Sequence, residues 1–221
     1  EAIVVPMPDS LSVATASLFN VMSNGVDWVL EVGGMQAGMT VAILGPGPRG
    51  IASVVAARTA GAAEIAVTGL ASDAERLALA LEAGADHALD VTGVNPVEAV
   101  LGALRSPPDL VVDCTPMSLS SVTDAVNMAA RRGVVVLAGM KGPGGMAPIP
   151  VDVVSGKQLT IKGAVSRSLQ SMEYAISLLA SGNAPYEKFA SHEYPLERAE
   201  EAMHALAGDD KPVHVRIVPS T

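Results

Sequence analysis

The stretch TVAILGPGPRGIASVVAARTAG, residues 40–61, decides the fold of this chain. It holds a short apolar run, Val41–Leu44, and a longer apolar segment that continues to about Ala60, joined by Gly45-Pro46-Gly47-Pro48-Arg49-Gly50. The short run predicts a strand and the longer segment a helix, which Gly61 is suited to end. A G-x-G-x-x-G motif is expected to bind a dinucleotide when it lies between a strand and a helix, as it does here.

Each glycine of the motif is needed for a different physical reason. Gly45 allows the tight turn, Gly47 lets the backbone approach a diphosphate, and Gly50 lets the helix pack closely on the strand. The helix N-terminus, which begins near Pro48, offers free N–H groups to an anion, and Arg49 can add charge-assisted hydrogen bonds. We therefore predict that these five residues bind a dinucleotide; a structural glycine-rich turn with a solvated arginine is the alternative.

On the C-terminal side of this stretch, short apolar runs alternate with helical patterns. Helices are predicted from the capping-box sequence Ser72-Asp73-Ala74-Glu75 to Gly84, over Pro96–Arg105 and over Ser118–Arg131. The pattern predicts an α/β fold, a doubly wound parallel sheet of the Rossmann type. The further strands are expected at Ile65–Thr68, His87–Asp90, Leu110–Asp113, Val134–Ala138 and Leu159–Gly163. The later helices Met172–Ala180 and Leu196–Ala207, with a terminal strand Val213–Val218, do not extend this alternation.

The end of the second strand bears on the choice of nucleotide. A carboxylate about 20 residues after the loop normally binds the adenosine ribose of NAD, but this chain has Gly69 there. A glycine leaves room for a 2′-phosphate, to which the side chains of Thr68, Ser72 and Arg76 could donate, so NADP is favoured over NAD. Asp73 could instead reach the ribose hydroxyls, and helix capping would explain both Ser72 and Asp73.

The amino-acid composition argues against several classes of function. Hydrophobic residues make up 49% of the 221 residues and charged ones 17%, which is enough to build a core. The net charge of −9 argues against binding nucleic acid or an anionic membrane surface. The most apolar stretch, Ile51–Ala71, contains Arg58 and Glu64, so a membrane span is not expected. With Cys114 as the single cysteine, a reducing, cytoplasmic location is expected.

The remaining chemically active residues form no recognisable catalytic set. No two of the four histidines have metal-ligand spacing within one predicted element, so we expect no metal site in this chain and assign no catalytic residue. Cys114 has no identifiable histidine partner and is interpreted as a small buried residue near the nucleotide. The histidines are His87, His192, His204 and His214.

The order of several segments carries a family resemblance. The chain resembles the medium-chain dehydrogenase/reductase family, within it the zinc-type alcohol and polyol dehydrogenase branch. The segments that carry the likeness are DSLSVATASLFN, the stretch around the glycine motif, RLALALEAGADHALD, PDLVVDCT, AARRGVVVLAGM, LTIKGA and HEYPLERAEEAMHAL.

The resemblance implies a cofactor domain and a GroES-like catalytic domain, of which this chain would hold only remnants. We expect residues 1–30 to be a connector, 31–165 the dinucleotide-binding domain, and 166–221 a segment that returns to the catalytic domain. Because the chain begins with Glu1, it is interpreted as a fragment or a processed chain.

The resemblance also implies further cofactor contacts at the ends of later strands. Asn20 falls where the family has a zinc-ligating Cys or Glu, and asparagine is a poor zinc ligand, so zinc in the complete enzyme is doubtful. The strand at 159–163 resembles the edge strand that pairs in family dimers, so a homodimer is expected. The additional cofactor contacts are Cys114, Thr115, Ala138, Gly139, Met140, Val165 and Ser166.

Together these observations favour an NAD(P)-dependent oxidoreductase that transfers hydride between nicotinamide and an alcohol or carbonyl compound. The main alternative is a nucleotide-binding module without catalysis, or a redox-sensing homologue. A methyltransferase is a third possibility, which the missing acid after the second strand disfavours.

Overall fold

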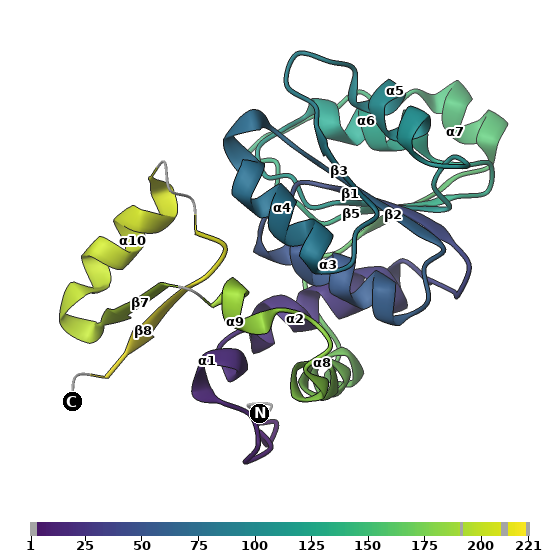
Figure 1. The fold of residues 1–221 in the computed structure, drawn as a ribbon. Coiled ribbons are helices and arrows are strands. Elements are labelled where there is room, and N and C mark those ends of the chain that lie inside the picture. The colour runs from purple at the N-terminus through teal and green to yellow at the C-terminus, as the bar shows by residue number, and fades with distance from the viewer. Residues whose placement is uncertain (1–3, 191, 209–211, 220–221) are drawn as a thin grey trace.

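The computed structural model describes residues 4–190, 192–208 and 212–219 and contains a six-stranded parallel sheet. Its strands are β1 (Thr40–Leu44), β2 (Glu64–Gly69), β3 (His87–Asp90), β4 (Leu110–Asp113), β5 (Val134–Leu137) and β6 (Thr160–Gly163). They lie in the order β3-β2-β1-β4-β5-β6, and every neighbouring pair is parallel. The chain therefore winds outward from β1 in both directions, and the predicted doubly wound α/β fold is confirmed (Figure 1).

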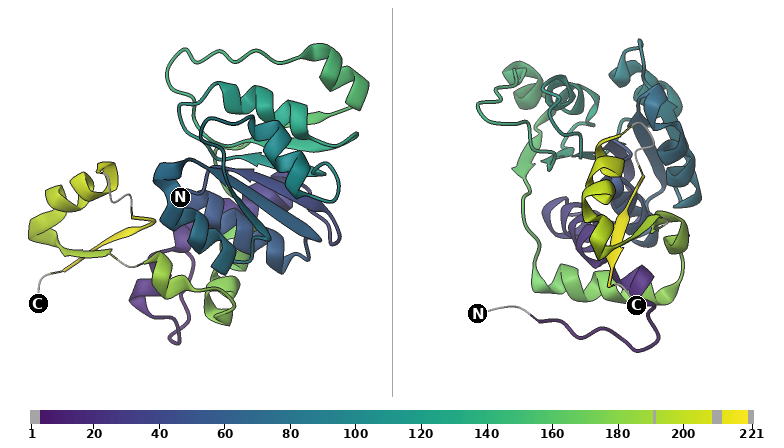
Figure 2. Two further views of the ribbon diagram at one scale, coloured as in Figure 1. Left: turned by 45° about the horizontal axis from the view of Figure 1, so that its top comes forward. Right: turned by 90° about the vertical axis from the view of Figure 1, so that its left-hand side faces the viewer.

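Helices cover both faces of this sheet, as Figures 1 and 2 show. On one face lie α2 (Phe19–Val26), α3 (Pro48–Thr59) and α4 (Ala74–Glu82); on the other lie α5 (Pro96–Ala103), α6 (Ser120–Met128) and α7 (Val151–Lys157). Successive residues of β1 point into different cores: Val41 and Ile43 into the first, Ala42 and Leu44 into the second. Burial on both faces explains why the central strands β1, β4 and β5 have apolar residues at consecutive rather than alternate positions.

The glycine at position 25 sets the contact between α2 and α3. A Cβ there would lie 2.5 Å from the backbone carbon of Ala52, so the two helices cross at a distance that only glycine permits. The α2 helix also packs on α8 (Leu169–Ser181) and continues into a π-helical segment, η1 (Asp27–Val32). Residues 19–32 are therefore fixed against the helix that follows the glycine-rich loop. Two short helices, α1 (Val13–Ala16) and α9 (Tyr186–Phe189), contact each other nearby.

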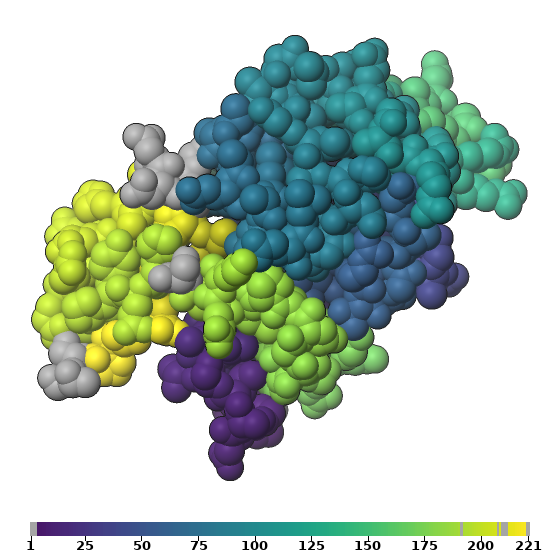
Figure 3. Space-filling view, in the orientation of Figure 1, coloured from purple at the N-terminus to yellow at the C-terminus, as the bar shows by residue number. Residues whose placement is uncertain are grey.

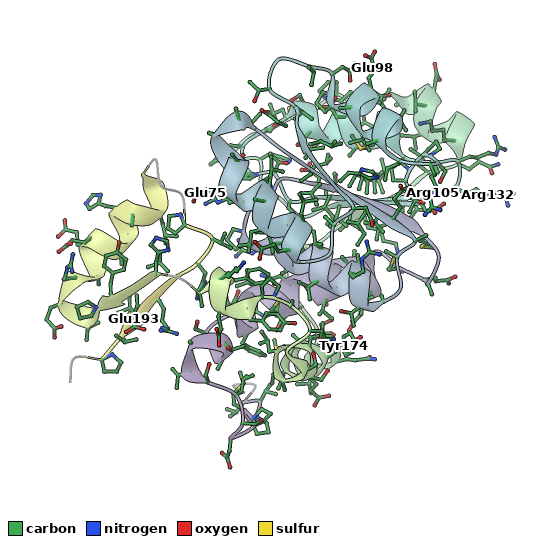
Figure 4. The ribbon with its side chains drawn as sticks, viewed as in Figure 1. Glu75, Glu98, Arg105, Arg132, Tyr174 and Glu193 are labelled. Carbon is green, nitrogen blue, oxygen red and sulfur yellow. The ribbon has the colours of Figure 1, made fainter. Side chains whose placement is uncertain are left out.

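The C-terminal segment forms a separate small sheet. Strands β7 (His192–Pro195) and β8 (Val215–Val218) are parallel and are connected through a 3-10 turn, η3 (Leu196–Arg198), and α10 (Ala199–Ala207). Figure 3 shows this segment, in yellow, to one side of the larger body. Glu193, labelled in Figure 4, pairs with Arg216 across the two strands. Ser17 hydrogen-bonds His214 at 3.1 Å and so joins this segment to the α1 region.

Several local features differ from the sequence-based expectations. The helix expected to start in a Ser72–Glu75 capping box is preceded by a 3-10 turn, η2 (Ala71–Asp73), and α4 begins at Ala74. Asp73 accepts a hydrogen bond from the N–H of Leu70 at 3.1 Å, which closes that turn, so the predicted box was wrong. Helix α7 and strand β7 were not predicted: α7 has no buried residue, and β7 is the polar sequence HEYP.

Glu64, at the start of β2, gives the fold a pH dependence. Its buried carboxylate accepts hydrogen bonds from the backbone N–H of Arg105 at 2.8 Å and from the His87 ring at 3.1 Å. These bonds, the Arg105 N–H first among them, lower the pKa of the Glu64 carboxyl from its ordinary value of 4.5. The unfolded chain therefore binds this proton more readily than the folded one does.

We expect Glu64→Gln to lower the free energy of unfolding by about 1.5–3 kcal/mol at pH 7, the usual value of a hydrogen bond to a charged group. The difference from wild type should persist above pH 4.5 and shrink as the pH falls through the lowered pKa. Urea unfolding at pH 7 and pH 3.5 measures it, with exposed Glu173→Gln as the control. A difference that stays equal at both pH values would contradict the assignment.

Candidate functional site

The glycine-rich loop makes a sharp turn between β1 and α3. Gly45 has a φ of +93°, a conformation that favours glycine, and its N–H donates to the Thr68 carbonyl at 3.0 Å. A Cβ on Gly50 would lie 2.0 Å from the carbonyl oxygen of Gly45, so the turn can close only if position 50 lacks a side chain. Two of the three motif glycines are therefore needed for the turn itself.

Gly47 differs from the other two because nothing in the fold requires it. A Cβ built at Gly47 has no atom within 4 Å, and its backbone, with a φ of −66°, is one that any residue adopts. Gly47 is the N-cap of α3, and no side chain caps this helix. The amides of the first helical turn thus face open space, with the positive end of the helix dipole behind them. This is the geometry that an anionic group needs.

The loop opens into a cleft of about 780 Å³ at the carboxyl ends of the strands. It lies where the chain reverses its winding direction between β1 and β4, the usual ligand position in open α/β sheets. The lining residues come from α2, η1, the loop after β1, the β2–α4 turn and the ends of β4, β5 and β6. They are Asn20, Asn24, Trp28, Gly45, Pro46, Gly47, Pro48, Arg49, Gly50, Leu70, Asp73, Arg76, Cys114, Thr115, Pro116, Ala138, Gly139, Met140, Val165 and Arg167.

Most of the residues predicted from the sequence meet in this cleft. Four do not line it: Thr68, Gly69, Ser72 and Ser166. The predicted residues that line it are Gly45, Gly47, Pro48, Arg49, Gly50, Arg76, Cys114, Thr115, Ala138, Gly139, Met140 and Val165. Their assignment as cofactor contacts stays a prediction.

Close packing explains why position 69 is a glycine. A Cβ at this buried position would lie 2.8 Å from the ring of Pro46 and 3.2 Å from a methyl group of Leu77. The space that glycine leaves is therefore occupied by the glycine-rich loop itself. The charged side chains that line this end of the cleft are Asp73 and Arg76, which lie 3.6 Å apart. The Arg76 guanidinium also donates to the Pro212 carbonyl at 3.1 Å.

A buried ion pair fixes the cleft floor between β4 and β5. Asp113, the last residue of β4, is fully buried, and Lys141 donates to its carboxylate at 2.7 Å. The same ammonium group donates to the Thr115 carbonyl at 2.5 Å and to Ser121 Oγ at 2.9 Å. The Thr115 N–H donates to the other Asp113 oxygen at 3.0 Å. Lys141 thus determines the position of Thr115 in the cleft wall.

Cys114 lies on the cleft wall beside this ion pair. Burial raises the pKa of the thiol to about 12, and the negative charge of Asp113 contributes in the same direction. The thiol is therefore protonated at neutral pH, which makes it a weak nucleophile. The Cys114 residue is half-buried rather than fully buried as the sequence suggested, and its role near the nucleotide stays a prediction.

The sequence did not single out one corner of the cleft, made of Asn24, Trp28 and Arg167 together with Asn20. Asn20 was noted only as a position where the family has a zinc ligand. Among the residues that the structure describes, no three His, Cys, Asp or Glu side chains gather so that they could hold a metal ion. The described side chains that line the cleft therefore offer no set of ligands that fits zinc. No helix in the described ranges is long and apolar enough to cross a membrane.

Comparisons with known proteins agree with this geometry. A family model described as zinc-binding dehydrogenase matches residues 48–181. The chain is 36% identical, over 99% of its length, to a probable alcohol dehydrogenase of Mycobacterium tuberculosis, and 32% identical, over 89%, to sorbitol dehydrogenase of Bos taurus. It spans only 61% and 54% of these relatives.

Solved structures of two dehydrogenases superpose on nearly the whole of this chain. The alcohol dehydrogenase TADH from Thermus sp. ATN1 superposes with a TM-score of 0.87 at 25% identity, covering 97% of this chain and 62% of that one. L-idonate 5-dehydrogenase from Escherichia coli superposes with a TM-score of 0.84 at 27% identity, covering 97% and 59%.

Proposed function

Since the chain belongs to the zinc-binding dehydrogenase family, we propose that it binds a nicotinamide dinucleotide for an oxidoreductase acting on an alcohol or carbonyl compound. The observation that carries this proposal is the unobstructed first turn of α3 at Gly47, which opens into the cleft at the switch point of the sheet. The relatives that share most of this chain are named as alcohol and sorbitol dehydrogenases, which supports the same reaction class.

The two ends of the cleft bind different parts of the dinucleotide. The amides of the α3 N-terminus and the guanidinium of Arg49 hold the diphosphate, because both present donors to an anion. Thr115, Met140 and Val165, which follow β4, β5 and β6, form the wall for the nicotinamide. A nicotinamide held there would supply hydride chemistry: an alcohol would lose hydride from its carbon and a proton from its hydroxyl, and a carbonyl compound would gain hydride at its carbon and a proton at its oxygen. The protein's contribution is to hold the reacting carbons at a fixed distance and to exclude water.

A binding titration and an assay test this proposal. We expect NADPH or NADH to bind this chain with a micromolar dissociation constant, while S-adenosylmethionine does not compete. The intact protein should change absorbance at the nicotinamide band when offered a panel of alcohols and aldehydes. Absence of nicotinamide nucleotide binding in calorimetry would refute the proposal.

We further propose that Asp73 and Arg76, rather than Gly69, decide between NADP and NAD, and that Arg76 tips the preference to NADP. Arg76→Gln should weaken NADPH binding about tenfold and leave NADH binding within about twofold, because only the 2′-phosphate needs a cation there. Parallel calorimetric titrations with the two nucleotides measure this. Asp73→Asn is the companion variant, and it should not weaken NADPH. Tighter binding of NADH that is lost in Asp73→Asn would show that the carboxylate selects NAD instead.

Two further proposals concern the oligomeric state of the protein and its location in the cell. Strand β6 is the last strand of the sheet, and Thr160 and Gly163 are exposed on it, so we propose that it pairs with the same strand of a second copy. The single cysteine favours a cytoplasmic location.

A nucleotide-binding module without catalysis is the second candidate. It is favoured by Asn20, a poor metal ligand that lines the cleft where the family resemblance places a metal-ligating Cys or Glu. Both candidates require nicotinamide nucleotide binding. An intact protein that binds the nucleotide but turns over no member of a broad alcohol and aldehyde panel would support the second.

A further inference from the structure

Arg76 connects the dinucleotide cleft to the C-terminal segment. It lines the cleft together with Asp73, and it also lines a separate cavity of about 260 Å³ to which Pro212 and Val213 contribute. Its side chain is only 18% exposed. Nη2 of the guanidinium donates to the Pro212 carbonyl at 3.1 Å, and Nη1 lies 3.6 Å from Asp73 Oδ1. The charged group is therefore held partly by a residue that lies outside the cleft.

The acceptor of this bond is part of the backbone that leads into the small C-terminal sheet. Pro212 is buried and lies three residues before β8, which starts beside α4 (Figure 1). Because a carbonyl group cannot rotate away as a side chain can, its position depends on where the whole segment docks. The position of the Arg76 guanidinium thus depends on the docking of residues 212–219.

His214 docks this segment on the helices behind the glycine-rich loop. Its Nε2 lies 3.1 Å from Ser17 Oγ, and since the Ser17 hydroxyl donates to the Ala14 carbonyl at 2.7 Å, the imidazole is the donor. The ring lines a closely packed pocket, with about 10 Å³ of free space, in which every other lining residue is apolar. Those residues are Leu18, Val21, Met22, Pro48, Ala52, Phe189 and Val213.

A neutral imidazole suits this pocket, whereas a charged side chain does not. Burial, followed by the positive charge of Arg216, lowers the pKa of His214 from its ordinary value of 6.5, so the ring is neutral at pH 7. Lys188 on α9 also pairs with Glu82 on α4, but both side chains are about half exposed. Exposed ion pairs contribute little to stability. Docking therefore depends chiefly on the His214 pocket and its hydrogen bond.

We propose that His214 is a positioning residue for nucleotide selection: by docking the C-terminal segment, it holds the Pro212 carbonyl against Arg76 and so fixes the guanidinium for the 2′-phosphate of NADP. A binding group is effective when its own position is fixed by packing and by further hydrogen bonds. This inference rests on the proposed function, in which Arg76 tips the preference to NADP. NADH has no 2′-phosphate, so its binding does not need a fixed guanidinium at this place.

His214→Asp tests the proposal, because a carboxylate is costly to bury among apolar residues. It should weaken NADPH binding to the intact protein about fivefold, the usual value of one hydrogen bond, and leave NADH binding within about twofold. Parallel calorimetric titrations measure both. His214→Gln, which keeps an N–H donor, should retain most of the NADPH affinity. The matched control is His204→Asp on α10, which makes the same change of charge at a side chain that is 79% exposed and should alter neither affinity.

A double variant supplies a readout that a general loss of structure would not give. If His214 acts through Arg76, His214→Asp combined with Arg76→Gln should bind NADPH no more weakly than Arg76→Gln alone. Should His214→Asp unfold in a thermal melt, Ser17→Ala, which removes only the acceptor, takes its place in the same cycle.

The possible failures are distinguishable. Unchanged NADPH affinity, equal losses of NADPH and NADH, or independent losses in the double variant would each overturn this inference while the Arg76→Gln result stands. An Arg76→Gln protein that binds NADPH as the wild type does would instead refute the proposed role of Arg76, and this inference with it. Absence of nicotinamide nucleotide binding in the wild type would refute the proposed function itself.

Discussion

Gly47→Val is expected to weaken nicotinamide nucleotide binding at least 100-fold while the folded structure persists. The valine side chain would occupy the open space at the start of α3, where no atom of the chain lies within 4 Å, and would block an anion from the helix amides. A 100-fold loss corresponds to about 2.7 kcal/mol of binding free energy. Calorimetric titration measures the affinity, and thermal unfolding should show a melting temperature close to that of the wild type.

Gly50→Val is the contrasting variant for this experiment. Its Cβ would lie 2.0 Å from the Gly45 carbonyl oxygen, so it should destabilise the fold itself. If Gly47→Val binds the nucleotide as the wild type does, the loop is not the diphosphate site. If it unfolds as Gly50→Val does, the two positions are not functionally distinct.

Lys141→Met is expected to lower the free energy of unfolding by about 3–5 kcal/mol, the usual result of removing one partner of a buried ion pair. The methionine fills similar volume, but it leaves the fully buried Asp113 carboxylate without its countercharge. For a chain of this size the melting temperature should fall by on the order of 10 °C. Because Lys141 also holds the Thr115 carbonyl, cofactor affinity should fall as well.

A double variant tests whether the uncompensated charge is the cause. Asp113→Asn combined with Lys141→Met removes both charges, so it should recover part of the stability lost in Lys141→Met alone. Chemical unfolding of the three proteins gives the coupling free energy. Additive losses would show that Lys141 acts through packing, without an energetic link to Asp113.

The fold was predictable because its central strands contain consecutive apolar residues and alternate with helical patterns. The expected bounds His87–Asp90 and Leu110–Asp113 match β3 and β4 in full. Where burial is weak, the sequence carries little information: α7 contains Gly156 and no buried residue, and so it has no apolar face to detect. The turn before α4 was mispredicted because Asp73 bonds back to Leu70 instead of following the capping-box pattern.

The candidate site was predictable in part. The glycine motif and the strand ends are local patterns, so the sequence placed them on one edge of the sheet in advance. The corner formed by Asn24, Trp28 and Arg167 depends on how α2 packs on α3 and α8, through the contact at Gly25. A corner of this kind exists only once the surrounding elements are packed, and no spacing in the sequence can show it.

The distribution of charge around the cleft has a kinetic consequence. The protein carries a net charge of −9, yet the cleft wall contains Arg49, Arg76 and Arg167, with Asp73 as the single acid among its lining residues. An incoming anion is thus repelled by the molecule as a whole and attracted at the mouth of the cleft. Because the Debye length is about 8 Å at physiological ionic strength, the long-range repulsion is screened first and the attraction survives at close approach. Capture of anions by this protein should consequently tolerate cellular salt.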